Sequence, residues 1–185
     1  MEEIIIADGV RSRLLLSGLK ELERHGVSDF SLRRVAQDAG VSCAAPYRHF
    51  KDKDELISSI IAFVLEGWTL LSTQLGDVFS SDSKALLTEL MVAGLRFWVA
   101  NGNFRTVIVA SASVQTGNHR VLDDFDEPII KAIERYKSEY ATESCDELKF
   151  KLLSMLYGTI ILVDGGYESA DIAANTLRNA LSSEL

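Results

Sequence analysis

Residues 31–56 read SLRRVAQDAGVSCAAPYRHFKDKDEL, and this stretch decides the fold of the N-terminal part of the chain. Ser31 offers a side-chain oxygen to cap a helix over residues 32–39. Gly40 ends that helix, and Ser42 is placed to cap another helix only two residues later. Two short helices joined by so tight a turn form a helix-turn-helix.

Helical spacing of apolar residues continues along the rest of the 185-residue chain. Hydrophobic residues make up 47% of the sequence, enough for the core of one or two small domains, and only two prolines interrupt it. The sequence therefore predicts an all-α fold of about nine helices. These are expected at about residues 7–24, 32–39, a short helix after Ser42, 52–79, 84–101, 104–112, 128–140, 145–163 and 169–182.

The polar segment TGNHRVLDDFDE, residues 116–127, is predicted to be a loop with room for one turn of helix, and Pro128 is expected at the first position of the helix that follows. Its acidic residues have the composition of a solvated loop rather than of a catalytic pair. The sequence has no GxSxG or P-loop motif, and its three histidines lack an i, i+4 partner suited to a metal. The protein is expected not to be an enzyme, and neither a cofactor nor a metal is expected.

The N-terminal segment MEEIIIADGVRSR has a short apolar run with no basic region before it, which does not fit a secretion signal. No later stretch reaches about 18 uncharged apolar residues. Cys43 and Cys145 lie far apart and match no metal-binding spacing, so reduced thiols are expected. These features predict a cytoplasmic protein with no membrane partner.

The charge of the chain is unevenly distributed. The net charge is −8, which by itself argues against a nucleic-acid partner. Residues 24–53, however, hold six Lys and Arg against three Asp and Glu, whereas residues 57–185 hold ten against seventeen. A basic N-terminal part on an acidic body suits a regulator that meets DNA with one end.

The second helix of a helix-turn-helix enters the major groove with its first turns, so small residues are needed there and polar groups beyond them. Ala44 and Ala45 are candidates for contact with thymine methyl groups, and Arg33 for a bidentate contact with guanine. Tyr47 and Lys53 are expected to bind phosphates, the lysine with the help of the N-terminus of the next helix. The full predicted DNA-binding set is Ser31, Arg33, Arg34, Ser42, Cys43, Ala44, Ala45, Tyr47, Arg48, His49, Lys51 and Lys53.

Residues 13–56 resemble the DNA-binding domain of TetR-family (tetracycline-repressor-like) transcriptional regulators. The resemblance rests on the small pair Ser17-Gly18, Gly26, Ala36, the turn Gly40-Val41-Ser42, Tyr47 with His49-Phe50, and Lys53 with Leu56. Pro46 departs from the commonest pattern, and it removes a helix hydrogen bond, so the base-facing set depends on where the helix starts.

The resemblance implies two domains, a DNA-binding domain at residues 1–56 and an effector-binding and dimerisation domain at residues 57–185. It implies a homodimer that binds a double-stranded DNA operator, releases it on binding a small-molecule effector, and pairs through its last two helices. For the effector pocket we expect Trp68, Met91, Phe97, Trp98, Phe104 and Tyr157. For the dimer interface we expect Leu152, Leu156, Ile160, Ile172, Leu177 and Leu181.

Each of these assignments has a simpler alternative. Arg33 and Arg34 could be solvated charges, and His49 could pack within its own domain. The aromatic residues could be core rather than pocket, and Leu156 and Ile160 could pack inside one chain. The alternative for the whole protein is a helical small-molecule-binding or interaction module without sequence-specific DNA binding.

Overall fold

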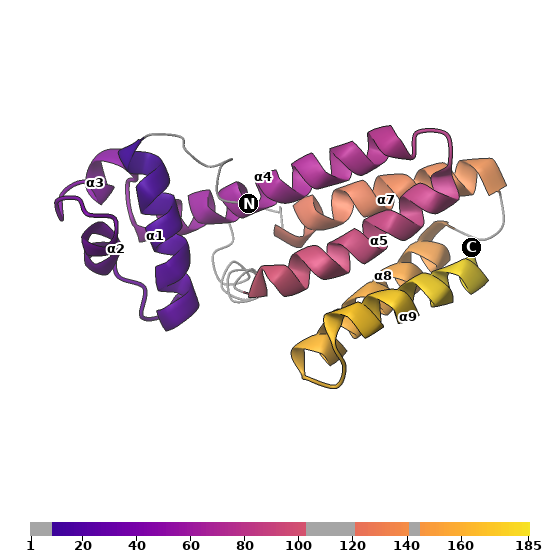
Figure 1. The fold of residues 1–185 in the computed structure, drawn as a ribbon. Helices are drawn as coiled ribbons and strands as arrows, with labels where there is room; N and C mark the ends of the chain where they lie inside the picture. The colour runs from indigo at the N-terminus through magenta and orange to yellow at the C-terminus, as the bar shows by residue number, and fades with distance from the viewer. Residues whose placement is uncertain (1–8, 103–120, 141–144) are drawn as a thin grey trace. The chain divides into compact units, whose positions relative to one another are not determined.

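The computed structural model describes residues 9–102, 121–140 and 145–185 (Figure 1). Eight helices and no strand lie in these residues, which confirms the all-α prediction. The expected helix at 104–112, with Phe104, lies outside the described residues. The helices are α1 (Val10–His25), α2 (Leu32–Asp38), α3 (Pro46–His49), α4 (Lys53–Val78), α5 (Ser83–Ala100), α7 (Val121–Tyr140), α8 (Cys145–Asp164) and α9 (Ala170–Glu184).

The chain forms two compact units, which divide inside α4 between Val64 and Leu65. The first unit holds α1, α2, α3 and the beginning of α4. The second holds the rest of α4 together with α5, α7, α8 and α9. The boundary expected from the sequence, after residue 56, lies earlier in the same helix.

In the first unit, α1 packs against α2 and α3 around a core that includes Leu14, Leu22 and Val35, all fully buried. Gly26 follows α1 with a φ of +66°, and Gly40 follows α2 with a φ of +64°. Both values lie in the left-handed region, which glycine adopts without steric cost. The chain can therefore reverse sharply twice within this unit.

The helix after the turn is shorter than the sequence suggested. It begins at Pro46 and ends at His49, so the prediction that Ser42 caps it is wrong. Ser42 instead accepts a backbone hydrogen bond from Ala45 at 2.8 Å, which makes residues 42–45 a turn ahead of the helix. Proline has no N–H and its fixed φ suits the first position of a helix, so the regular helix begins there.

A capping box opens α4, as its sequence indicates. The Asp52 side chain accepts from the Glu55 N–H at 2.9 Å, and the Glu55 carboxylate accepts from the Lys51 N–H at 2.6 Å. By length and composition α4 would be able to cross a membrane. Its apolar residues Ile60 and Trp68 are nevertheless fully buried among other helices of the protein, which is the environment of a core helix.

The second unit is built on α5, against which both α8 and α9 pack (Figure 1). The prediction of a loop before Pro128 is wrong in part, because α7 already begins at Val121 and Pro128 lies inside this helix. Asp123 and Asp124 occupy the first turn of α7, where negative charge favours a helix N-terminus. Phe125 is fully buried, and its packing offsets the hydrogen bond that proline cannot make.

Candidate nucleic-acid interface

The turn and short helix at residues 42–49 present small and polar side chains to solvent. Ala45 and Pro46 are buried, whereas the hydroxyl, thiol, cationic and aromatic groups around them are exposed. Eight of the twelve predicted DNA-binding residues are exposed: Arg33, Ser42, Cys43, Ala44, Tyr47, Arg48, His49 and Lys51.

Tyr47 has 64% of its surface exposed, although a tyrosine ring ordinarily buries its apolar body. It lies on α3 directly before Arg48 and His49, which are also exposed. A phenol and two groups that can donate to anions are thus gathered next to short side chains that allow close approach. This combination is suited to a duplex surface, since phosphate oxygens accept such hydrogen bonds.

Ala45 does not take the role predicted for it. Its side chain is buried in the turn, so it has no surface for a thymine methyl group. Ser31 is also engaged, because its Oγ accepts the Arg34 N–H at 3.4 Å as the N-cap of α2. Ala44 is exposed, and its apolar contact with a thymine methyl group stays a prediction.

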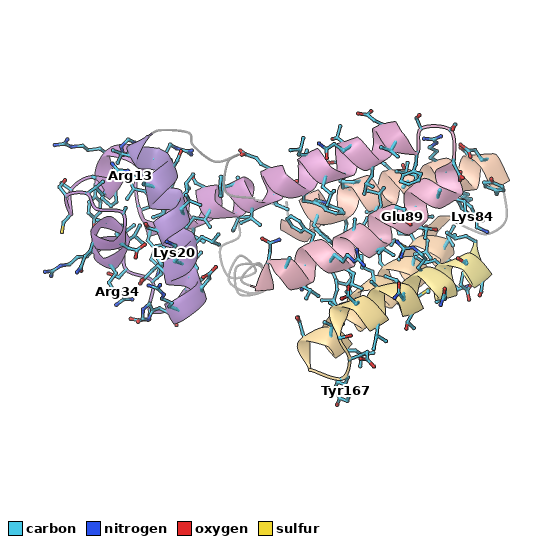
Figure 2. All side chains as sticks on the ribbon, viewed as in Figure 1. Arg13, Lys20, Arg34, Lys84, Glu89 and Tyr167 are labelled. Carbon is cyan, nitrogen blue, oxygen red and sulfur yellow. The ribbon has the colours of Figure 1, made fainter. Side chains whose placement is uncertain are left out.

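Arg34, which is labelled in Figure 2, is held by carboxylates of its own domain. Its Nε donates to Glu21 at 2.6 Å, and its Nη2 lies 3.1 Å from the Asp29 carboxylate. The hydrogen bond to Glu21, followed by the charge of Asp29, raises the pKa of the Arg34 guanidinium above its ordinary value. Arg33 on the same helix is exposed.

Lys53 is half-buried and also has a partner inside the first unit. Its Nζ donates to the Val27 carbonyl at 2.5 Å and lies 6.0 Å from the centre of the Phe30 ring. The lysine therefore ties the start of α4 to the connection between α1 and α2. Its predicted contact with a phosphate stays a prediction.

Three residues that the sequence did not single out also shape this surface. Glu21 carries a carboxyl group but is buried. The sequence feature that could have indicated this burial is its helical spacing from Leu14 and Gly18, which places it on the apolar face of α1. Arg11 lies over the Phe50 ring at 5.4 Å, and Arg13 donates to the Ala39 carbonyl at 3.3 Å. These two arginines hold α1 against Ala39, which follows α2, and Phe50, which follows α3.

Residues 14–60 match the family model described as bacterial regulatory proteins, tetR family. The transcriptional regulator AcrR of Shigella flexneri is 32% identical over 93 residues, which cover 46% of this chain and 40% of that protein. Residues 14–60 therefore match the DNA-binding part of the TetR family of transcriptional regulators. The relatives it matches are named as regulators and not as enzymes.

One further relative and one solved structure extend the similarity beyond the DNA-binding unit. The transcriptional regulator SAB2452 of Staphylococcus aureus is 26% identical over 137 residues, 72% of this chain and 74% of that protein. The structure of the TetR family regulator PfmR from Thermus thermophilus covers 91% of this chain and 96% of its own, with a TM-score of 0.71 and 23% identity. That structural likeness is one of fold.

The aromatic residues predicted for the effector pocket pack against one another. The Trp68 ring stacks on Phe125 with centroids 4.8 Å apart, and Trp98 meets Tyr157 edge-on at 5.9 Å. Trp68, Met91 and Trp98 are buried, and Phe97 and Tyr157 are half-buried. Within the described residues these side chains form core.

A cavity of about 340 Å³ lies instead among α4, α5 and α7 of the second unit. Residues of α4 contribute hydroxyl groups to its lining, residues of α5 contribute apolar side chains, and residues of α7 contribute charged side chains. The lining residues include Thr69, Ser72, Thr73, Leu86, Leu90 and Lys131. None of the predicted pocket residues lines this cavity.

The predicted dimer-interface residues are mostly inside the chain. Leu152, Leu156, Ile160, Leu177 and Leu181 are buried within the second unit, so their side chains have no surface for a partner. This part of the interface prediction is wrong, because the apolar stripe of each helix faces α5. Ile172 alone of that set is exposed. The exposed apolar residues of α8, α9 and the turn between them are Phe150, Ile161, Leu162, Tyr167 and Ile172.

Proposed function

We propose that this protein is a ligand-responsive transcriptional regulator of the repressor type, which binds a palindromic operator as a homodimer and leaves it when a small-molecule effector binds. It would act in the cytoplasm, where the DNA is. The exposed set at residues 42–51, with Tyr47 at its centre, is the observation that carries the proposal. A solvent-facing tyrosine followed by exposed Arg48 and His49 has no role in the core of its own unit.

In this proposal Cys43 and Ala44 meet base edges, and Arg33 reads a guanine. Tyr47, Arg48, His49 and Lys51 bind phosphates on either side. Short side chains in the turn let its backbone approach the major groove, and the cations supply the electrostatic part of the affinity. The acidic remainder of the chain limits binding to this one face, since phosphates repel it.

Dimerisation is assigned to the exposed apolar side chains of α8. Phe150 is 76% exposed and Ile161 is 68% exposed, at positions that share one face of the helix with Ser154 and Gly158. A helix face with large apolar groups at its ends and small residues between them allows close approach of a second helix. Two copies paired there would present two DNA-binding units to two half-sites about 34–36 Å apart.

Effector control is assigned to α4, which contributes residues to both units. The cavity among α4, α5 and α7 contacts the second half of α4, and Lys53 at its other end is tied to the first unit. A ligand in the second unit changes DNA affinity only if it prefers one conformation of α4 over another. The lining is mostly apolar and carries hydroxyl and charged groups, which favours an effector with an apolar body and polar groups.

The test is selection of bound duplexes from random DNA, followed by measurement of affinity for the enriched sequence. Arg33→Ala is expected to weaken specific binding by about 5- to 150-fold, because a bidentate contact with a base contributes about 1–3 kcal/mol. Tyr47→Phe should weaken it several-fold through loss of about 1 kcal/mol of hydrogen bonding. Arg96→Ala removes an exposed cation from α5 in the second unit and should leave affinity unchanged.

Failure to enrich any sequence would contradict the proposal and favour a binding module that does not recognise DNA. If a sequence is enriched but both variants bind it as well as the wild type, the family assignment stands and the residue assignment fails. A subsequent screen for small molecules that release the duplex tests the effector. If compounds bind the protein but none of them releases the duplex, the proposed response to a ligand is contradicted.

A further inference from the structure

Glu21 is a carboxylate buried on the inner face of α1, with only 6% of its surface exposed. Its Oε1 accepts a hydrogen bond from the Ser31 backbone N–H at 3.1 Å and another from Arg34 Nε at 2.6 Å. Arg34 Nη2 also lies 2.6 Å from the same oxygen. A carboxylate that leaves water needs such partners, because an unpaired buried charge costs several kcal/mol.

These contacts join the C-terminal part of α1 to the first turn of α2. Ser31 is the N-cap of α2, and Arg34 is its third residue. A second carboxylate, that of Asp29 in the preceding turn, lies 3.1 Å from Arg34 Nη2, and the same nitrogen donates to the Asp29 carbonyl. His25 Nε2 stands 3.9 Å from Glu21 Oε2, so the carboxylate is enclosed by α1, the turn and α2.

The pairing has a consequence for the two adjacent arginines of α2. Arg33 is exposed, whereas the charge of Arg34 is matched by Glu21 and Asp29. A cation that already has two carboxylates gains little from a phosphate and releases few counterions on binding DNA. The two adjacent arginines are the same residue type, but the charge of Arg34 is matched by carboxylates of the protein and Arg33 is exposed to solvent.

We propose that Glu21 is a positioning residue for DNA recognition: it fixes the first turn of α2 and withholds Arg34 from the DNA backbone, so that Arg33 is the α2 cation that reads the duplex. This inference rests on the proposed function. It assigns discrimination between operator and random DNA to a residue that touches neither. Without Glu21, Arg34 would add a sequence-independent phosphate contact beside Arg33.

The experiment measures affinity as a function of salt for the selected operator and for a random duplex, in the full chain. Glu21→Gln keeps the size of the side chain and an acceptor for Ser31 but removes the charge that holds Arg34. We expect its log–log salt slope on random DNA to steepen by about 0.9, the value for one added phosphate contact, and its preference for the operator to fall at least several-fold. Arg34→Gln should leave the slope at the wild-type value.

The double variant Glu21→Gln with Arg34→Gln should return the slope on random DNA to that of the wild type. Glu23→Gln is the matched control, because Glu23 is an exposed carboxylate of the same helix and its loss changes the net charge equally. This control should move the slope by less than half as much. Urea unfolding of every variant reports how much stability each change removes.

Several results would overturn the inference. If Glu21→Gln lowers stability without steepening the slope, Glu21 serves the fold alone. If Arg34→Gln flattens the slope by about 0.9, Arg34 is itself a phosphate contact. This second result is decisive even where Glu21→Gln does not fold. Equal steepening by Glu23→Gln would reduce the effect to net charge, whereas a wild-type chain that binds no duplex would overturn the proposed function as well.

Discussion

The indole N–H of Trp68 donates to the backbone carbonyl of Phe125 at 2.9 Å, and the two rings stack with their centroids 4.8 Å apart. Both side chains are fully buried. A hydrogen bond and an aromatic contact therefore fasten the second half of α4 to α7. The indole supplies both, since a buried tryptophan needs an acceptor for its N–H.

Trp68→Phe is expected to lower the free energy of unfolding by about 2–3 kcal/mol. About 1 kcal/mol comes from the lost hydrogen bond and the rest from the volume that phenylalanine leaves empty. Urea unfolding followed by circular dichroism measures the change. Leu70→Ala, at an exposed position of the same helix, should alter stability by less than about 0.5 kcal/mol, and an equal loss in both variants would contradict the role of Trp68.

Gly18 on α1 lies close to the Ile60 side chain of α4 in the first unit. A Cβ atom there would stand 2.6 Å from Ile60 Cδ1, closer than carbon atoms pack. Gly18→Val should therefore destabilise the protein by about 1–3 kcal/mol, and combining it with Ile60→Ala should cost less than the sum of the two changes. Gly76→Ala is the control: nothing lies within 4 Å of its added Cβ, so it should raise stability by about 0.5–1 kcal/mol through helix propensity. Additive losses for the double variant would show that the two helices do not meet at this pair.

The pH dependence of stability should include a contribution from Glu139. The hydrogen bond from the Ser83 hydroxyl, followed by the one from Arg135, holds the pKa of the Glu139 carboxyl below its ordinary value of 4.5. A lowered pKa in the folded state stabilises the protein above the ordinary pKa, and this stability is lost as pH falls from 4.5 through the folded value. Glu139→Gln should therefore be less stable than the wild type at pH 7, and the difference should shrink below pH 4.5.

Thermal unfolding at a series of pH values measures this convergence. Ser83→Ala should remove the larger share of the effect, because its hydroxyl is the first cause of the shift. Lys131→Gln, which removes the partner of an exposed i, i+4 pair with Glu127, is the control and should leave the pH profile unchanged. A gap between Glu139→Gln and wild type that persists undiminished to pH 2 would contradict the linkage.

Ile161→Glu should convert the proposed dimer to a monomer, because it places a charge on an exposed apolar position of α8. A loss of about 2 kcal/mol or more of association energy, which is about a 30-fold rise in the dimer dissociation constant, is expected. Sedimentation at micromolar concentration measures it. Val78→Glu introduces the same charge at an exposed apolar position of α4 and should leave the dimer intact. If both variants or neither dissociate, the interface lies elsewhere.

Most of the helix-turn-helix was predictable from local chemistry. Ser31, the Asp52–Glu55 capping box and the glycines after α1 and α2 act through their own neighbours, so each could be assigned from spacing alone. The start of α3 was not, because Pro46 and the Ser42 cap gave opposite indications. The prediction of a loop before Pro128 was wrong for a related reason. Proline at this position indicated a helix start, but the burial of Phe125 by helices distant in sequence favoured a helix that begins earlier.

The candidate surfaces were less predictable than the helices. Arg33 and Arg34 look alike in the sequence, and what distinguishes them is the pairing of Arg34 with the carboxylates of Glu21 and Asp29. An apolar residue on α8 likewise looks the same whether it faces the core or solvent. Leu156, expected at the dimer interface, is buried, whereas Ile161, for which no role at the interface was predicted, is exposed.

The sequence by itself determined the helices, their caps and the helix-turn-helix, because these follow from hydrogen bonds and apolar spacing within a few residues. Only the tertiary structure decided which charges are matched, which apolar faces are buried and where a cavity is left. Those outcomes depend on distances between residues far apart in the chain, and no local pattern encodes such distances.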